Sequence, residues 1–303
     1  MEIVKLKPAV KDYIWGGKKL KEWGKSSSSD TIAECWELSF NIDGPSLIDS
    51  GKDKGKFLKD IATPSDIGSV PASFQFFPIL NKLIDAADNL SVQVHPSDDY
   101  ALANEGQYGK TEMWYVIHAE PGSGLYVGFQ NETTPEEVRD AVDKGTLLSL
   151  LSFHEVKEGE TYFIPSGTVH AIGRGVMVME IQQNSTLTYR LYDYKRLGKD
   201  GKPRELHLEK ALKVLDYHPY NPPHFKKPCL GACSYFQVYE VPFDGDKNIV
   251  APKDSFVSLT FVEGEGSFAS LLFKKGDTFF VPCGKSGVIR GKGKAILSQV
   301  EHL

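Results

Sequence analysis

The sequence has few cysteines, no strong excess of charge and no long apolar run, and each absence excludes a class of protein. Four cysteines at irregular spacing in 303 residues do not make a disulfide framework. A formal net charge of -5 gives no basis for binding nucleic acid or another polyanion. No window approaches the roughly 20 apolar residues of a membrane span, and the N-terminus lacks a secretory pattern. We therefore expect a cytoplasmic protein, monomeric or weakly homo-oligomeric, that binds neither nucleic acid nor membrane.

Short apolar runs separated by Gly, Pro and Asn dominate the chain and predict a mainly β protein. Helical periodicity is confined to a few segments. One begins at the Thr134 cap with Pro135 at the first helical position, and another begins at about Glu205. The Pro-rich stretch HPYNPPHFKKP reads as a linker. It predicts a domain at 1–225 and a second domain at 226–303.

One motif occurs twice. GETYFIPSGTVHAIG at 159–173 and GDTFFVPCGKSGVIRG at 276–291 both run Gly, five residues, Pro, one residue, Gly. Each copy predicts a strand followed by a tight turn. His170 stands three positions after the second Gly of the first copy, whereas Gly287 occupies that position in the other copy. The two copies therefore share a predicted backbone but not an imidazole.

The first copy resembles the second signature of the cupin superfamily, whose members are antiparallel jelly-roll barrels. In that superfamily the inward-facing histidine, here His170, is a metal ligand. Arg174 departs from the pattern, which commonly has Asn at that position. The resemblance implies two cupin-type antiparallel jelly-roll barrels with a few inserted helices. It also implies that the second barrel, which lacks the histidine, is kept for structure.

Further ligands are expected from the preceding strand pair, LSVQVHPSDDYA at 90–101 and GKTEMWYV at 109–116. Alternate residues of a strand share a face. Two sets therefore project together: Ser91, Gln93 and His95, and Lys110, Glu112 and Trp114. An unpaired carboxylate among apolar neighbours is costly, and coordination to a divalent cation would remove that cost. His95, Glu112 and His170 are thus the candidate metal ligands, with the Gln93 amide as a possible fourth.

A histidine in a strand is more often a hydrogen-bonded core residue than a ligand. That reading is assigned to the six remaining histidines, which are His118, His154, His207, His218, His224 and His302.

Several motifs narrow the resemblance to one family. YIWGG at 13–17, AECWELS at 33–39, FPILNKLIDAADNLSVQVHP at 77–96, GKTEMWYV, IPSGTVHAIG and STLTYRLYDY at 185–194 together resemble a short bacterial type I phosphomannose isomerase. This resemblance implies a mannose-6-phosphate isomerase with one zinc ion per chain. It implies zinc ligands at His95, Glu112 and His170, often joined by Gln93, and an active-site arginine at Arg190.

The implied reaction sets the other expectations. Aldose-ketose isomerisation moves a proton between C1 and C2 through an enediol, so negative charge develops on the sugar oxygens, and a metal with open positions can stabilise it. The phosphate needs fixed cations, for which Arg190 and Lys110 are the best candidates. Gln93 is a further candidate contact to the substrate. Glu180 is either the proton-transferring base or a support for the metal site, and Asp193 and Lys110 are weaker candidates for the base.

Two other functions stay open. Two histidines and a carboxylate also describe a non-haem iron oxygenase. A cupin can also bind a sugar phosphate without turning it over. Fold analogy cannot separate these readings. Oxygen uptake would identify the first, and binding without ketose formation would identify the second.

Overall fold

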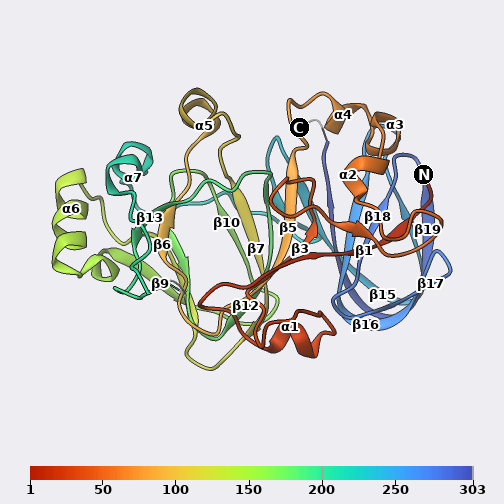
Figure 1. Ribbon diagram of the computed structural model, residues 1–303, viewed down its shortest axis with the longest axis horizontal. Coiled ribbons are helices and arrows are strands. Elements are labelled where there is room, and N and C mark those ends of the chain that lie inside the picture. Colours follow the sequence, from red (N-terminus) through yellow and green to blue (C-terminus); the bar gives the residue numbers. More distant parts are fainter. Residues whose placement is uncertain (199–200, 302–303) are drawn as a thin grey trace.

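Antiparallel strands are the main regular structure of the molecule (Figure 1), and the predicted mainly β class is confirmed. The computed structural model describes residues 1–198 and 201–301. Within these residues the strands form three sheets rather than two closed barrels. We call them the outer, central and C-terminal sheets. No helix of the described residues is both long and apolar enough to cross a membrane.

The outer sheet has five strands, in the order β13 (Tyr189–Tyr192), β6 (Val92–Val94), β11 (His170–Ile172), β8 (Gly124–Phe129) and β9 (Leu151–Glu155). The central sheet has six, in the order β10 (Thr161–Ile164), β7 (Glu112–Ala119), β12 (Val176–Gln183), β5 (Ile79–Asp85), β3 (Glu34–Leu38) and β2 (Ala9–Lys11).

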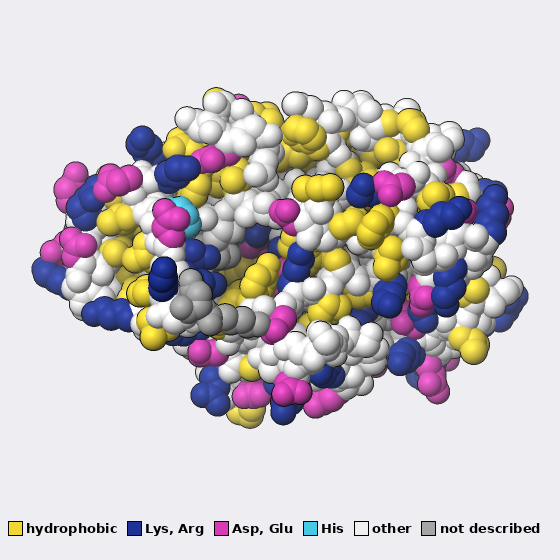
Figure 2. Space-filling model, viewed as in Figure 1, with side chains coloured by type: hydrophobic (Ala, Val, Ile, Leu, Met, Phe, Trp, Pro, Cys, Tyr) yellow, Lys and Arg dark blue, Asp and Glu magenta, His cyan; other side chains and the backbone are white. Residues whose placement is uncertain are grey.

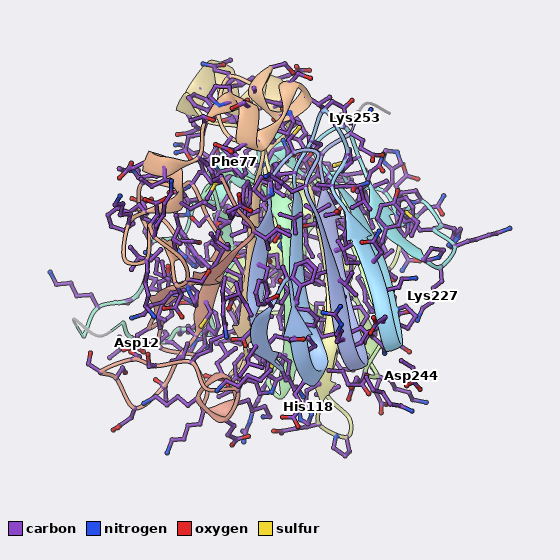
Figure 3. The ribbon with its side chains drawn as sticks, turned by 90° about the vertical axis from the view of Figure 1, so that its right-hand side faces the viewer. Asp12, Phe77, His118, Lys227, Asp244 and Lys253 are labelled. Atoms are coloured by element: carbon purple, nitrogen blue, oxygen red, sulfur yellow. The ribbon has the colours of Figure 1, made fainter. Side chains whose placement is uncertain are left out.

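The C-terminal sheet has eight strands, in the order β14 (Cys229–Ala232), β15 (Gln237–Val250), β19 (Ser286–Gln299), β16 (Val257–Phe268), β18 (Thr278–Val281), β1 (Val4–Lys7) and β4 (Leu47–Ile48), with β17 (Leu271–Lys274) beside β16. Its long strands run side by side in Figure 3. The domain boundary near residue 225 stays a prediction. The structure adds that β1 and β4, from the first segment, pair within this sheet.

The helices are short and lie outside the sheets (Figure 1). They are α1 (Lys19–Glu22), α2 (Leu58–Ile61), α3 (Pro64–Ile67), α4 (Ser69–Ala72), α5 (Asp98–Glu105), α6 (Pro135–Lys144) and α7 (Leu208–Val214), with a 3-10 turn at Leu147–Leu150. The predicted start of α6 is confirmed, because Thr134 caps it and Pro135 is its first residue. Helix α7 begins later than Glu205, because the His207 amide donates to the Arg190 carbonyl and so ties this stretch to β13.

Strand alternation makes the central sheet two-faced. Its apolar residues toward the C-terminal sheet include Leu83, Met113 and Ile181, which share a core with Phe256 and Phe280. Residues whose side chains lie on the other face, such as Ile84, Trp114 and Val178, pack with the outer-sheet residues Leu125 and Val127. The central sheet therefore lies between the other two, with different partners on its two faces.

The second copy of the motif forms β18 and the start of β19, where a phenylalanine-rich core fills the space of a ligand. A Cβ atom at Gly287 would lie 2.8 Å from the ring of Phe268 and 3.0 Å from Ile3. Phe268 is buried beside Phe279, and the rings of Phe261 and Phe273 stack at 3.6 Å. This part of the sheet therefore has no room for a side chain where the first copy has its histidine.

Candidate metal centre and pocket

A pocket of about 450 Å³ opens between the facing sides of the central and outer sheets. Figure 2 shows a hollow near the middle of the face in view, with charged side chains at its rim. Strands of the central sheet contribute Lys82 and Glu180, and strands of the outer sheet contribute Gln93, His170 and Arg190. Size and polarity suit a small charged molecule.

His95, Glu112 and His170 meet beside this pocket, which His170 itself lines. His95 follows β6, Glu112 begins β7 and His170 begins β11. One ligand atom from each residue lies within 4.8 Å of those of the other two. All three side chains are buried, with side-chain exposures of 1%, 0% and 1%. The structure thus brings together the three residues that strand alternation and the repeated motif singled out.

The hydrogen bonds of the two histidines orient both rings as metal ligands would be. Nδ1 of His95 is 2.7 Å from the Leu187 carbonyl oxygen, and Nδ1 of His170 is 2.9 Å from that of Thr168. A carbonyl oxygen can only accept, so each Nδ1 carries the proton and each Nε2 presents a lone pair. These Nε2 atoms lie 3.6 and 3.4 Å from the Glu112 carboxylate.

Burial and charge add to this fit. Burial lowers the pKa of His170 to about 4, and burial together with Lys110 lowers that of His95. Both rings are therefore neutral near pH 7, as metal coordination requires. The Glu112 carboxylate is buried, and apart from its 3.0 Å ion pair with Lys110 it has no hydrogen-bond partner among the described residues. Two imidazoles and a carboxylate form a donor set that suits zinc or a similar divalent cation.

Lys110 and Gln93 line the pocket beside the cluster. Nζ of Lys110 is 3.0 Å from the Glu112 carboxylate and 3.1 Å from Nε2 of His95, and the residue is only 4% exposed. Nε2 of Gln93 is 3.3 Å from Nε2 of His170. Because an amide group can be turned to exchange its nitrogen and oxygen, Gln93 can present either atom to the cluster.

Glu180 is held in a chain of alternating charges on the same face of the central sheet. Its carboxylate lies 3.0 Å from Nζ of Lys82, 3.9 Å from Nζ of Lys110, and accepts a 3.0 Å hydrogen bond from Trp114. Glu34 lies 3.7 Å from Nζ of Lys82 on the other side.

The charged groups in this series shift one another's pKa values. Burial alone would raise the pKa of Glu180, but Lys82 and Lys110 outweigh it and lower that pKa. Burial and the Glu180 charge raise the pKa of Glu112 to about 7. Glu180 is therefore the carboxylate that stays ionised most readily.

Arg190 reaches the pocket from β13. Its Nε donates to the Ser91 hydroxyl at 3.2 Å, and its Nη1 donates to the Glu205 carbonyl at 2.8 Å. Arg204 also lines the pocket, with its guanidinium on the Asp193 carboxylate at 2.5 and 2.7 Å. Asp193 is also bound by Arg196, so its oxygens are engaged by two arginines and are poorly placed to accept a substrate proton.

Sequence reasoning assigned no role to Lys82, Glu34 or Trp36, which all line the pocket. The Trp36 indole donates to Glu34 at 2.6 Å, as Trp114 does to Glu180. A signal was present, because Lys82 interrupts the apolar run ILNKLID, which is buried along its whole length. A lysine in such a strand needs a carboxylate partner.

The remaining histidines lie outside the cluster as far as the structure describes them. His207 contacts a pocket residue, because its Nδ1 accepts a 3.2 Å hydrogen bond from the Arg190 amide. His218 is largely exposed, with its ring 2.9 Å from Asp216. His302 lies outside the described residues.

Comparison with known proteins yields one consistent family. The profile of the phosphomannose isomerase type I catalytic domain matches residues 3–124. The mannose-6-phosphate isomerase ManA of Bacillus subtilis (strain 168) is 37% identical over 292 residues, which cover 92% of each chain. A mannose-6-phosphate isomerase from Streptococcus mutans is 42% identical over 67% of this chain and 64% of its own.

Solved structures agree with this result. The crystal structure of the mannose 6-phosphate isomerase from Bacillus subtilis superposes with a TM-score of 0.88 at 33% identity and covers 98% of this chain and 99% of its own. Phosphomannose isomerase variants from Salmonella typhimurium reach a TM-score of 0.79 at 17% identity, with full coverage of both chains. At that identity the likeness concerns the fold alone.

Proposed function

The chain belongs to the type I phosphomannose isomerase family, and from this premise we propose that it interconverts mannose 6-phosphate and fructose 6-phosphate with one bound zinc ion. The observation that carries the proposal is the cluster of His95, Glu112 and His170, which adjoins a charged pocket through His170. These three residues would hold the metal. When bound, a divalent cation there stabilises negative charge on the sugar oxygens.

The protein's own groups would orient the sugar around that centre. Lys110, beside Glu112, is a fixed positive charge close to where the oxygens of C1 and C2 would lie. Gln93 can donate to or accept from a sugar hydroxyl at the same end. Arg190 presents its guanidinium to the pocket and would hold the phosphate or the charge that develops in the reaction, because its fork suits anionic oxygens.

Proton transfer between C1 and C2 needs a base within reach of the substrate. Glu180 is ionised, lines the pocket and is oriented by Trp114 and Lys82. We assign it this role over Asp193, which is not among the described residues that line the pocket and whose carboxylate is bound by Arg196 and Arg204. The enediol formed on removal of the proton would be stabilised by the nearby cations, since charge on its oxygens faces positive groups.

The alternative readings differ in what they consume. A non-haem iron oxygenase would use the same donor set but would take up oxygen. A binding protein would hold the sugar phosphate unchanged. Anionic-substrate anchors such as Arg190 and the membership of the isomerase family favour isomerisation.

The direct test follows fructose 6-phosphate as it forms from mannose 6-phosphate, with protein loaded with zinc, treated with a chelator, or reloaded. We expect turnover that disappears on chelation and returns on reloading, with no oxygen uptake. Sugar phosphate that is bound by the loaded protein but never converted would instead favour a binding function. Oxygen consumption would favour the oxygenase.

A further inference from the structure

The C-terminal sheet carries polar contacts to the central sheet that the proposed reaction does not use. Most of the interface between these sheets is apolar. Inside it, Nδ2 of Asn81 on β5 donates to the hydroxyls of Ser298, at 2.7 Å, and Ser258, at 3.2 Å. All three residues are buried, with exposures of 0% or 1%, and the two serines face each other across β16 and β19.

Asn81 directly precedes Lys82, so one strand has two functions on its two faces. Lys82 points toward the pocket and pairs with Glu180, whereas Asn81 points toward the C-terminal sheet. Apolar contacts are not directional and tolerate small shifts. A single buried amide with fixed partners specifies register, as a buried Asn does between helices of a coiled coil.

A second contact acts on the neighbouring strand, β3. The pairing of β3 with β5 shifts between Trp36 and Leu38, so Glu37 is an extra, bulged residue. Glu37 is fully buried, and its carboxylate is 2.6 Å from Nζ of Lys25. The same Nζ donates to the carbonyl of Gly276, the first residue of the second motif copy. The bulge that directly follows Trp36 is therefore held from the C-terminal side.

We propose that the C-terminal sheet is a positioning element for the reaction, which places Lys82 and Trp36 through Asn81 and Glu37. The inference rests on the proposed function, because it concerns the rate of that reaction. It explains why the second motif copy persists without a histidine, since its backbone holds Lys25, which in turn holds Glu37. Asn81 and Glu37 are positioning residues and do not touch the substrate.

The test replaces the three hydrogen-bonded residues Asn81, Ser258 and Ser298 together by apolar residues of similar shape, in the variant Asn81→Leu/Ser258→Ala/Ser298→Ala. Removing all partners together leaves no buried group unsatisfied, so we expect the melting temperature to stay at or above that of the wild type. Metal content and KM should stay unchanged. The kcat should fall about tenfold, because small displacements of reacting groups cost orders of magnitude in rate. Ser255→Ala is the matched control, because this buried hydroxyl bonds Phe256 and Val300 of the C-terminal segment and not the central sheet.

Three outcomes would overturn the positioning role: a wild-type kcat in the triple variant, a fall in kcat that matches a loss of metal, or a fall that matches a loss of stability. If the triple variant does not fold, Ser298→Ala removes the shorter hydrogen bond alone, and a wild-type kcat there would also reject the role. The wild type is assayed alongside. An inactive wild type would reject the proposed isomerase function, whereas a fast triple variant beside an active wild type would reject only the positioning role.

Discussion

Lys82 offers a sharp test of the charge chain in the pocket, because its partners and distances are defined. Its ammonium is almost fully buried, 3.0 Å from Glu180 and 3.7 Å from Glu34. At an effective dielectric constant of about 20, each such pair attracts by about 5 kcal/mol before the cost of desolvation. Breaking a buried pair by removing one partner costs about 3–5 kcal/mol, because the other charge is left uncompensated. We expect Lys82→Met to lower the free energy of unfolding by that amount.

The double variant Lys82→Met/Glu180→Gln separates this explanation from simple loss of packing. It removes a carboxylate together with the cation, so its free energy of unfolding should lie above that of Lys82→Met. Urea titration of the metal-free proteins measures both. Lys144→Met, which removes an exposed lysine paired with Asp140, should change little and serves as the control. The reasoning would be refuted if Lys82→Met lost less than about 1 kcal/mol in free energy of unfolding. It would also be refuted if the loss in the double variant equalled the sum of the losses in Lys82→Met and Glu180→Gln.

Three further results are expected. Arg190→Lys should recover only a small part of the catalytic efficiency lost in Arg190→Ala, since lysine keeps the charge but not the fork; an Arg190→Ala enzyme as efficient as the wild type would remove the arginine from the mechanism. Glu180→Gln should bind metal and sugar phosphate but lose most of its rate, about 100-fold or more, and in heavy water it should place less deuterium at C1 or C2 than the wild type does; normal turnover would show that Glu180 is not the base. Gly287→Val should destabilise the protein by about 1–3 kcal/mol in thermal unfolding, because its Cβ would meet the Phe268 ring at 2.8 Å, and unchanged stability would contradict the packing argument.

Within one strand or turn, the sequence was enough to predict which side chains lie on the same face. Alternation placed Gln93 with His95 and Lys110 with Glu112, and the Pro-x-Gly turn set the direction of His170. The structure brings these residues to one site because β11 pairs with β6, with His170 opposite Gln93. Their assignment as metal ligands and substrate contacts remains a prediction that the experiments above address.

Contacts between strands that are far apart in the sequence could not be predicted from it. Alternation cannot say which strands lie close together. The sequence could therefore not identify Glu180 as the carboxylate partner that Lys82 needs, nor place Glu34 and Trp36 in the same pocket. The extension of the C-terminal sheet by β1 and β4 depends on pairing across most of the chain, which no local pattern encodes.

Metal content measured together with isomerase activity tests the central claim most directly, in the wild type, in His170→Ala and in the exposed-site control His218→Ala. We predict one tightly bound divalent ion per chain in the wild type and in His218→Ala, with conversion of mannose 6-phosphate to fructose 6-phosphate in both. His170→Ala should lose the ion and the activity together while it stays folded. Two ions per wild-type chain, or a His170→Ala protein that keeps its ion and its activity, would contradict the account.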